Sequence, residues 1–257
     1  MQEDFKWRHF EGEIILWAVR WYCKYGISYR ELEEMLKERG VDVDHSTIYR
    51  WVQHYAPELQ KRLKWYFKGA QGGSWRVDET YIKVKGQWRY LYRAVDAKGY
   101  TVDFYLSQTR TAQAAKRFLG KALYKKKEWE LPHTINTDKA ASYGVAIQEL
   151  KAEGKLPQDT LYRQVKYLNN IVESDHGKLK RLIKPTLGFK TMKTAYATLK
   201  GFEAMRSIKK GQGSAYRIQE GVMGEVRLVE RCFQLGKSPI AELVEWFNAQ
   251  SVLPNAA

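Results

Sequence analysis

Three segments rich in β-forming residues, joined by two short turns, limit what this chain can fold into more than any other feature. They are SWRVDETYIKV (74–84), QWRYLYRAVD (87–96) and YTVDFYLSQ (100–108). The connections between them, KG and AKG, contain the glycine that tight turns favour. Three consecutive strands with such turns predict an antiparallel meander.

Helices and strands alternate after the meander. The residue patterns predict a helix over 111–127, a short strand running into a loop over 133–140, a helix over 141–154, a strand over 160–167 and a long helical region from 169 onward. This order of elements is that of the RNase H-like fold: three strands, followed by a helix, a strand, a helix, a strand and a helix. We therefore expect an α/β (α+β) protein with an RNase H-like mixed sheet and flanking helices.

The first 67 residues have helical rather than strand periodicity. Apolar residues recur at helical spacing in EIILWAVRWYCKYG (13–26), SYRELEEMLKERG (28–40) and HSTIYRWVQHY (45–55). Ser28 and Glu31 form the pattern of a capping box, and Pro57 is expected to limit the length of the third helix. A helix, a turn carrying glycine and a second helix predict an all-α helix-turn-helix domain ahead of the sheet.

In a helix-turn-helix protein the second helix lies in the DNA major groove. The residues off the apolar face near the start of this helix are the candidate DNA readers: Ser46, Thr47, Tyr49, Arg50 and Gln53. Residues 1–67 carry 11 basic and 11 acidic residues, so they would contribute sequence choice more than affinity. A three-helix bundle that docks another protein has the same pattern and stays open as an alternative.

Changes in composition divide the chain into four parts. They are a helix-turn-helix DNA-binding domain (1–67), a glycine-rich linker (68–74), an RNase H-like catalytic domain (75–217) and a C-terminal helical tail (218–257). Within the tail, Ser238 and Pro239 are expected to start an amphipathic helix that could serve self-association.

The net charge of +15 and a pI near 9.6 indicate a polyanionic partner. Residues 163–217 hold 13 basic and three acidic residues, two thirds of that charge, which favours double-stranded DNA over a solvated helix face. No apolar run approaches the roughly 18 residues of a membrane span, and no signal peptide is recognisable. With only Cys23 and Cys232, a disulfide framework has little support, so we expect a cytoplasmic protein without membrane contact.

Three carboxylates lie where these elements would bring them together. Asp78 lies within the first strand, where aspartate is disfavoured and needs a partner such as a metal ion. Asp138 ends the fourth strand, and Glu173 starts the helix after the fifth. In an RNase H-like sheet strands one and four are adjacent and the final helix crosses beside them, so the three side chains are expected to converge.

Carboxylate oxygens suit Mg²⁺, and two such ions about 3.5–4 Å apart serve phosphoryl transfer. We therefore expect Asp78, Asp138 and Glu173 to bind two Mg²⁺ ions, with Mn²⁺ as a substitute. Lys180, two helical turns after Glu173, is expected to hold the DNA backbone beside the metal. The neighbouring cations that would widen this contact are Lys178, Arg181 and Lys184.

Each acid also has a purely structural interpretation. Asp78 could cap a turn, Asp138 could cap the following helix, and Glu173 could be a first-turn acid favoured by the helix dipole. Asp175 and His176 are interpreted as neighbours without chemistry.

Several stretches resemble the DDE transposases of bacterial insertion sequences, and among them the insertion sequence six family. They are WRVDETYIKVKGQWRYLYRAVDAKGYTVDFYLS, INTDKA, ESDHGKLKR and LGFKTMKTAYATLKGFEAMR, together with the helix-turn-helix segment ILWAVRWYCKYGISYRELEEMLKERGVDVDHSTIYRWVQ. The resemblance covers about residues 5 to 231. The stretch QLGKSPIAELVEWFNAQSVLPNAA at the end does not match the family pattern.

The resemblance implies a Mg²⁺-dependent transposase that binds the terminal inverted repeats of its element. Such an enzyme cleaves DNA to expose a 3′-hydroxyl and joins the element to target DNA as a cointegrate. By position, Asp78, Asp138 and Glu173 match the family's acidic triad, and Lys180 matches its basic residue two turns on. Joining two ends implies a homodimer or a higher homo-oligomer, and the resemblance also implies a bacterial, nucleoid-associated protein.

Three other classes share parts of this pattern. A sequence-specific DNA-binding repressor with an inactive RNase H-like core would keep the helix-turn-helix and the charge but need not keep all three acids. A tyrosine recombinase is disfavoured because none of the five histidines precedes an arginine in an HxxR box. RNase H itself would not need the N-terminal reader.

Overall fold

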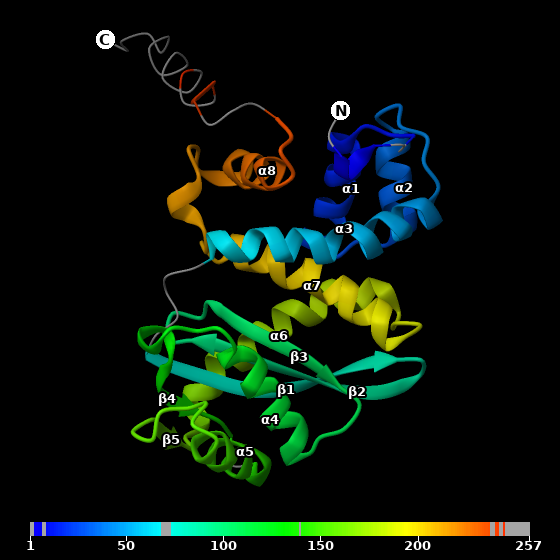
Figure 1. Cartoon of the computed structure of the whole chain (residues 1–257). Helices are drawn as coiled ribbons and strands as arrows, with labels where there is room; N and C mark the ends of the chain where they lie inside the picture. The colour runs from blue at the N-terminus through cyan, green and yellow to red at the C-terminus, as the bar shows by residue number, and fades with distance from the viewer. Residues whose placement is uncertain are drawn as a thin grey trace, which may run out of the picture.

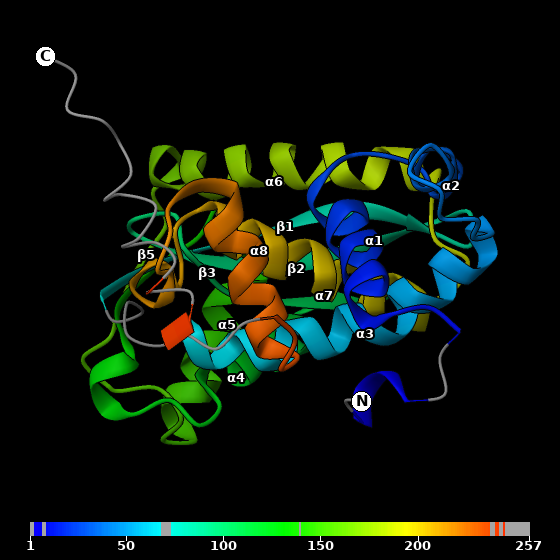
Figure 2. The same cartoon turned by 90° about the horizontal axis from the view of Figure 1, so that it is seen from above.

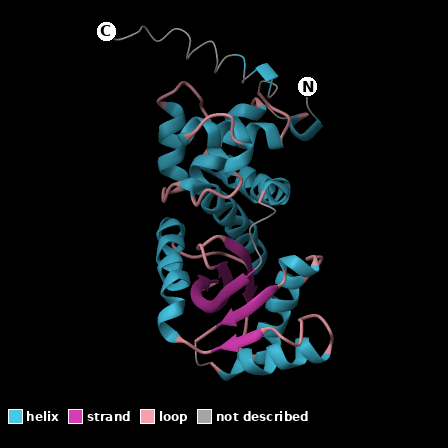
Figure 3. Cartoon of the chain, turned by 90° about the vertical axis from the view of Figure 1, so that its left-hand side faces the viewer, coloured by secondary structure: helices cyan, strands magenta, loops and turns pink. Residues whose placement is uncertain are grey.

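A computed structural model describes residues 3–6, 9–67, 73–138, 140–236, 240, 241 and 244. A layer of helices from both ends of the chain lies over one face of a five-stranded sheet, and two further helices cover the other face (Figure 1). The side view in Figure 3 separates the helical half from the half that contains the sheet. Within the described residues, no helix is both long and apolar enough to cross a membrane.

The N-terminal helices confirm the predicted periodicity. They are α1 (Gly12–Lys24), α2 (Tyr29–Lys37) and α3 (His45–Tyr66), and a 3₁₀ helix, η1 (Glu3–Phe5), precedes them. The capping box at the start of α2 is present, because the Ser28 side chain accepts from the Glu31 amide and the Glu31 carboxylate accepts from the Ser28 amide. Asp44 caps α3 by accepting from the amide of Ser46 at 2.7 Å.

The expectation that Pro57 limits the third helix is wrong, because α3 continues through Pro57 to Tyr66. A proline inside a helix removes one backbone hydrogen bond and crowds the preceding turn. Beyond the proline, Leu59 and Leu63 are buried in the same core as the residues before it. Burial of these side chains offsets the local cost of the proline.

The sheet has the strand order β3-β2-β1-β4-β5. β1 pairs antiparallel with β2, β2 pairs antiparallel with β3, and β4 lies parallel to both β1 and β5. This confirms the meander and the adjacency of the first and fourth strands, in an α/β chain with a mixed sheet. The strands are β1 (Gly73–Val84), β2 (Gln87–Asp96), β3 (Thr101–Ser107), β4 (Pro132–Asn136) and β5 (Leu161–Arg163).

The remaining helices follow the predicted order. They are α4 (Ala112–Leu123), α5 (Ala141–Ala152), α6 (Asn170–Ile183), α7 (Met192–Lys209) and α8 (Gly221–Cys232), with the 3₁₀ helices η2 (Glu128–Glu130), η3 (Lys166–Asn169), η4 (Lys184–Thr186) and η5 (Ser214–Tyr216). The helix expected to start at Ser238 and Pro239 begins outside the described residues.

The fifth strand is shorter than predicted, and the end of β4 explains why. The side chain of Asn136 bonds to Val165 twice, through its carbonyl to the Val165 amide and through its amide to the Val165 carbonyl. These bonds replace the next rung of the β-ladder. The chain after Arg163 therefore leaves the sheet and forms η3 instead of continuing as a strand.

Two hydrophobic cores lie on opposite faces of the sheet. Along β1 the side chains alternate, so that Trp75 and Val77 enter the core under α4 and α5, while Ile82 and Val84 enter the core under α6 and α7. The second of these cores also contains the buried residues of α1, α3 and α8. The N-terminal helices thus share a core with α7 and the sheet, and the predicted domain boundaries stay a prediction.

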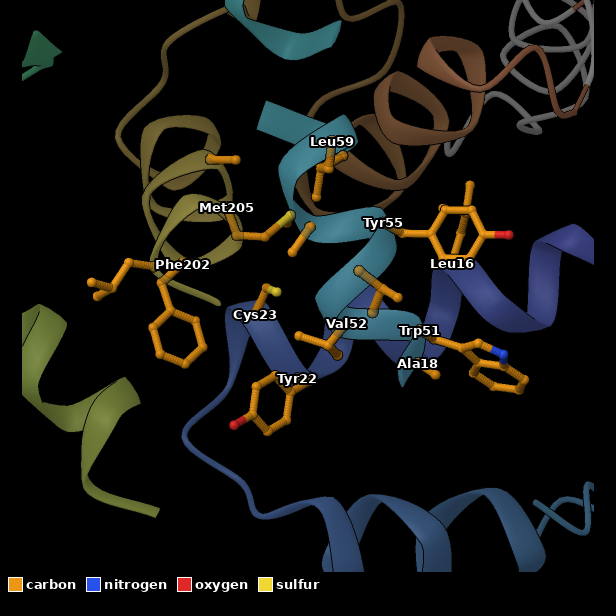
Figure 4. Close-up of a cluster of buried hydrophobic side chains, with 14 of the residues drawn as sticks. Leu16, Ala18, Tyr22, Cys23, Trp51, Val52, Tyr55, Leu59, Phe202 and Met205 are labelled. Atoms are coloured by element: carbon orange, nitrogen blue, oxygen red, sulfur yellow. The ribbon is translucent and has the colours of Figure 1, made fainter. Parts of the chain in front are cut away.

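The closest approach in this shared core is at Gly201 of α7, beside Cys23 of α1 and Ala56 of α3. Figure 4 shows Cys23 among the side chains that α1, α3 and α7 contribute. A Cβ at Gly201 would lie 2.4 Å from the Cys23 sulfur and 2.7 Å from the Ala56 methyl. Only glycine lets the three helices pack at this separation.

We predict that Gly201→Ala lowers the free energy of unfolding by about 1–3 kcal/mol, because the added methyl overpacks the core. Urea denaturation measures the loss, and Cys23→Ala in the same chain should restore part of it. Gly177→Ala is the matched control, because a Cβ there meets nothing within 4 Å. That control should gain roughly 0.5–1 kcal/mol from helix propensity. Equal effects of the two substitutions would contradict the close packing at Gly201.

Candidate active site

Asp78 lies on the part of β1 that β4 does not cover. The pairing of β1 with β4 ends at Arg76 and Asn136, so β4 leaves the edge of β1 open at Asp78, and Phe189 pairs with that edge only at its far end, beside Val84. Asp138 follows β4 by two residues, and its carboxylate accepts from the amide of Ala140 at 3.0 Å. Carboxylate oxygens of Asp78, Asp138 and Glu79 all lie within 4.8 Å of one another. The structure therefore brings together two of the three predicted acids.

Two buried asparagines join the elements that carry the predicted acids. Asn136, at the end of β4, donates to the side-chain oxygen of Asn169 at 2.7 Å. Asn169 precedes α6 and donates to the carbonyl of Val77, the residue before Asp78, at 3.3 Å. These bonds fix the start of α6 beside the open edge of β1. Sequence reasoning missed both residues, because nothing local distinguishes them from other polar residues near element ends.

Glu173 lies in the first turn of α6 and is exposed. Its charge contributes to raising the pKa of Asp78, so it acts on the same site, but its oxygens are not in the group within 4.8 Å. Val172 and His176 are four residues apart on the buried face of α6, whereas Glu173 lies on its exposed face. The structure thus places Glu173 within electrostatic reach of Asp78 rather than in contact with it.

Glu79 is an acid of the site that sequence reasoning did not single out. It is buried, it accepts from the hydroxyl of Tyr143 at 2.6 Å, and it pairs with Arg110. The Arg110 guanidinium also lies 3.9 Å from the carboxylate of Asp138. The carboxylate of Glu79 therefore already has protein partners, whereas Asp78 has no arginine or lysine within ion-pair distance among the described residues.

Burial, followed by the charges of Glu79, Asp138 and Glu173, raises the pKa of Asp78 to about 7. Its side chain is only 14% exposed. Crowded carboxylates repel one another until a cation or a proton compensates them. A half-buried set of hard oxygen donors suits Mg²⁺ or a similar divalent ion, so the residues present fit the predicted metal.

His176 contacts the same carboxylate from the α6 side, with its Nδ1 3.5 Å from an oxygen of Asp78. Burial and the nearby charge of Arg93 lower the pKa of His176 to about 3, so the imidazole is neutral at physiological pH. Its Nε2 has no hydrogen-bond partner among the described residues. From the sequence alone His176 is a neighbour without chemistry, whereas the structure places its ring against Asp78.

A buried network of charges lies behind the acids. Arg93, which is opposite Asp78 in the β1–β2 register, donates to Glu203 of α7 at 2.7 and 2.9 Å and to Asp175 of α6 at 2.5 Å. Asp175 also pairs with Arg206, and with Lys210 at 2.9 Å. Burial alone would raise the pKa of Asp175, but these three cations hold it well below its usual range. The network ties α6 and α7 to the sheet.

The predicted DNA-contacting cations of α6 and its end are all exposed: Lys178, Lys180, Arg181 and Lys184. None has an acidic partner within 4.0 Å in the part of the chain that the structure describes. These four cations follow Glu173 in the chain and are not paired with acids, as expected from the sequence. Their contact with DNA stays a prediction.

The predicted readers on α3 lie in different surroundings. Ser46 and Arg50 are exposed, and the Arg50 guanidinium donates back to the Ser46 carbonyl and hydroxyl. Thr47 is half-buried, and the ring of Tyr49 packs edge-on against Tyr29. Gln53 is half-buried, and its amide donates to Thr198 of α7 at 2.8 Å. Gln53 therefore already has a partner within the chain.

Comparison with known proteins places the chain in a family. Residues 72–212 match the family model described as a DDE domain. Two transposases of Staphylococcus aureus, that of the insertion sequence-like element IS431mec and that of IS257 in transposon Tn4003, are each 41% identical over 211 residues, which cover 80% of this chain and 88% of theirs. The chain belongs to the DDE transposases of the insertion sequence six family, and it is an enzyme of DNA transposition.

Integrase catalytic cores are among the solved structures that align with this chain. The catalytic core domain of BIV integrase aligns with a TM-score of 0.40 and 15% identity, over 71% of this chain and 99% of that one. The magnesium complex of the HTLV-2 integrase core aligns with a TM-score of 0.39 and 19% identity, over 51% of this chain and 82% of that one.

We predict that Asp78→Asn stabilises the metal-free protein relative to the wild type by a free energy of unfolding that grows as the pH rises from about 4 to 7. The pKa of Asp78 is about 7 in the folded chain against an ordinary value of 3.8, so in this window the folded state binds the proton that the unfolded state releases. Asp78→Asn cannot titrate and should become more stable than the wild type by about 2–4 kcal/mol above pH 7.

Urea denaturation in the presence of a chelator, repeated across the pH range, measures this difference. Asp159→Asn, at an exposed aspartate outside the site, is the control and should follow the wild type at every pH. If the free energy of unfolding changed with pH in the same way for the wild type and Asp78→Asn, the crowding of charge at Asp78 would be contradicted.

Proposed function

We propose that this transposase binds the terminal inverted repeats of its own insertion sequence and cleaves DNA there in a Mg²⁺-dependent reaction. The freed 3′-hydroxyl then attacks target DNA, and the element and target are joined as a cointegrate. The observation that supports this best is the meeting of Asp78 and Asp138 at the open edge of β1, with Glu173 in electrostatic reach.

Asp78, Asp138 and Glu173 are the residues that would hold the metal. Glu79 is left out of this set because Tyr143 and Arg110 already occupy its carboxylate. Two bound Mg²⁺ ions, or Mn²⁺ in their place, would activate the attacking oxygen and stabilise the leaving one. The raised pKa of Asp78 supports the assignment, since a cation would compensate the repulsion that keeps this group partly protonated.

The other residues of the site orient the acids and hold the substrate. Neutral His176 packs against Asp78 and limits the positions its carboxylate can take. Lys180, two turns along α6 from Glu173, would bind a phosphate of the DNA backbone beside the acids. The exposed cations around it extend this contact, and their binding would weaken as salt concentration rises.

The helix-turn-helix would supply sequence choice. The second turn of α3 offers Arg50, whose guanidinium is exposed and, among the described residues, bonds only to Ser46 of its own helix. An exposed arginine near the start of a recognition helix suits a bidentate contact with guanine. Because two ends of one element are joined, we expect a homodimer or a higher homo-oligomer. No feature of the site favours the alternative of a repressor with an inactive core.

Substitution of the acids tests the proposed reaction. Asp78→Asn, Asp138→Asn and Glu173→Gln each keep the shape of the side chain and remove one ligand charge. We expect each to abolish Mg²⁺-dependent strand joining, while binding to a DNA end carrying the flanking repeats of the gene is retained. Double variants should be scarcely worse than single ones, because the acids act as a unit.

Asp159→Asn and Glu128→Gln are matched controls at exposed acids outside the site, and both should join strands at the wild-type rate. Joining is measured by gel electrophoresis of labelled ends with and without Mg²⁺. Full joining by Asp138→Asn would remove that residue from the metal set, and absence of joining by the wild-type protein would refute the proposed function.

A second experiment tests the reader helix. Arg50→Ala should weaken binding to the terminal repeat by roughly 5- to 100-fold, the effect of losing one bidentate base contact, and leave binding to random DNA unchanged. Gln53→Ala, measured beside it, separates base reading from packing on Thr198. Competition gel shifts measure the preference, and urea denaturation measures stability. A variant lacking Arg50 that still discriminates its repeat would refute the assignment.

A further inference from the structure

A groove of about 700 Å³ opens between the β1–β2 hairpin and the end of α6. Its aromatic lining comes from the hairpin, as Tyr81, Trp88 and Tyr90, and its basic lining is Lys83, Lys180 and Lys184. No acidic residue is among the described residues that line it. The groove therefore combines ring faces with positive charge.

The aromatic side chains lie on one face of the hairpin. Tyr81 is opposite Tyr90 in the antiparallel register, and Lys83 is opposite Trp88. The ring centroids of Tyr81 and Tyr90 are 5.3 Å apart. Tyr81 is 44% exposed and Trp88 is 63% exposed. Large rings exposed together at a concave surface indicate a binding site rather than a core.

The other wall is held in place by backbone bonds to the free edge of β1. The amide of Phe189 donates to the carbonyl of Lys83 at 2.9 Å, and the amide of Lys85 donates to the carbonyl of Phe189 at 2.7 Å. Leu187 and Gly188 make the turn before this pairing with positive φ angles of 54° and 102°. Figure 2 shows α6 running along the β1 side of the sheet toward this wall. The groove is thus built by fixed backbone on both sides.

The groove continues from the acidic cluster. Tyr81 follows Glu79 by two residues and so lies on the same face of β1. Trp88 pairs with a residue five positions beyond Asp78, a separation of about 17 Å along the strand. This is the reach of a few nucleotides.

We propose that the groove binds unpaired nucleotides of the DNA strand next to the phosphate that is cut, with their bases stacked on Tyr81 and Trp88. Inside a duplex the faces of the bases are covered by their neighbours, so exposed rings can stack only on bases that have left the pairing. Lys180 and Lys184 are placed to bind the phosphates of that strand. The proposal rests on the proposed function and assigns the aromatic hairpin to the DNA substrate of the same site.

The test compares a blunt DNA duplex with the same duplex carrying a short unpaired arm that contains 2-aminopurine. Binding is measured without divalent metal, so that the acids do not cut the DNA. We expect the wild-type protein to prefer the unpaired arm and to quench its fluorescence by stacking. Trp88→Ala should reduce affinity for the arm by roughly 5- to 100-fold, the effect of losing one stacked base, with little change for the blunt duplex.

Trp88→Phe keeps a ring and should retain most of the preference, whereas Trp88→Leu should not. Trp129→Ala is the matched control, because Trp129 is 71% exposed and lies outside the groove. An unchanged preference in Trp88→Ala, or equal weakening for the arm and the blunt duplex, would overturn the proposal. So would a change in self-association by sedimentation with no change in arm binding, which would assign the groove to a second copy of the chain.

The result of this binding experiment is independent of the proposed reaction, because the measurement does not require strand joining. A wild-type protein that prefers the unpaired arm but does not join DNA ends would leave the groove assigned and the reaction refuted. A protein that joins ends but shows no preference for the unpaired arm would support the reaction and refute the assignment of the groove.

Discussion

The hydrogen bonds of Asn136 and Asn169 are the interaction on which the site depends. They link the end of β4, the carbonyl beside Asp78 on β1 and the start of α6, which are the three places where the acids occur. Because the side chain of Asn136 also ends the pairing of β4 with β5, the same group stops the sheet and leaves the edge of β1 open. The acids, α6 and the aromatic groove all lie along that edge.

Charge is arranged in layers around this edge. The crowded carboxylates include Asp78, which is opposite Arg93 of the buried ion pairs in the β1–β2 register, and the exposed cations follow Glu173 along α6. Buried ion pairs contribute little net stability, but removing one partner leaves an uncompensated charge that is costly. Arg93, Asp175 and Glu203 therefore hold α6 and α7 in one arrangement against the sheet, and they do so next to a set of acids that is itself unfavourable without a cation.

The shared core connects the N-terminal helices to the site. α3 packs on α7 through residues such as Leu59, through the close approach at Gly201 and through the bond from Gln53 to Thr198. α7 in turn carries Glu203, which holds Arg93 opposite Asp78. The same packing therefore connects α3 to the helix that holds Arg93 beside the acids.

The sequence by itself determined the order and type of most elements, because periodicity, turn residues and caps act over a few positions. The meander and the capping box at Ser28 follow from such local signals. The strand adjacency that joins Asp78 to Asp138 is expected from the RNase H-like order of elements that these signals predict. The tertiary structure alone decided the partners of Glu79, the contact of His176 with Asp78 and the extension of α3 past Pro57. These depend on groups far apart in the chain, such as Tyr143 and Glu79, which are 64 positions apart. Local pattern cannot rank such long-range contacts, because their energies arise only when burial removes the groups from water.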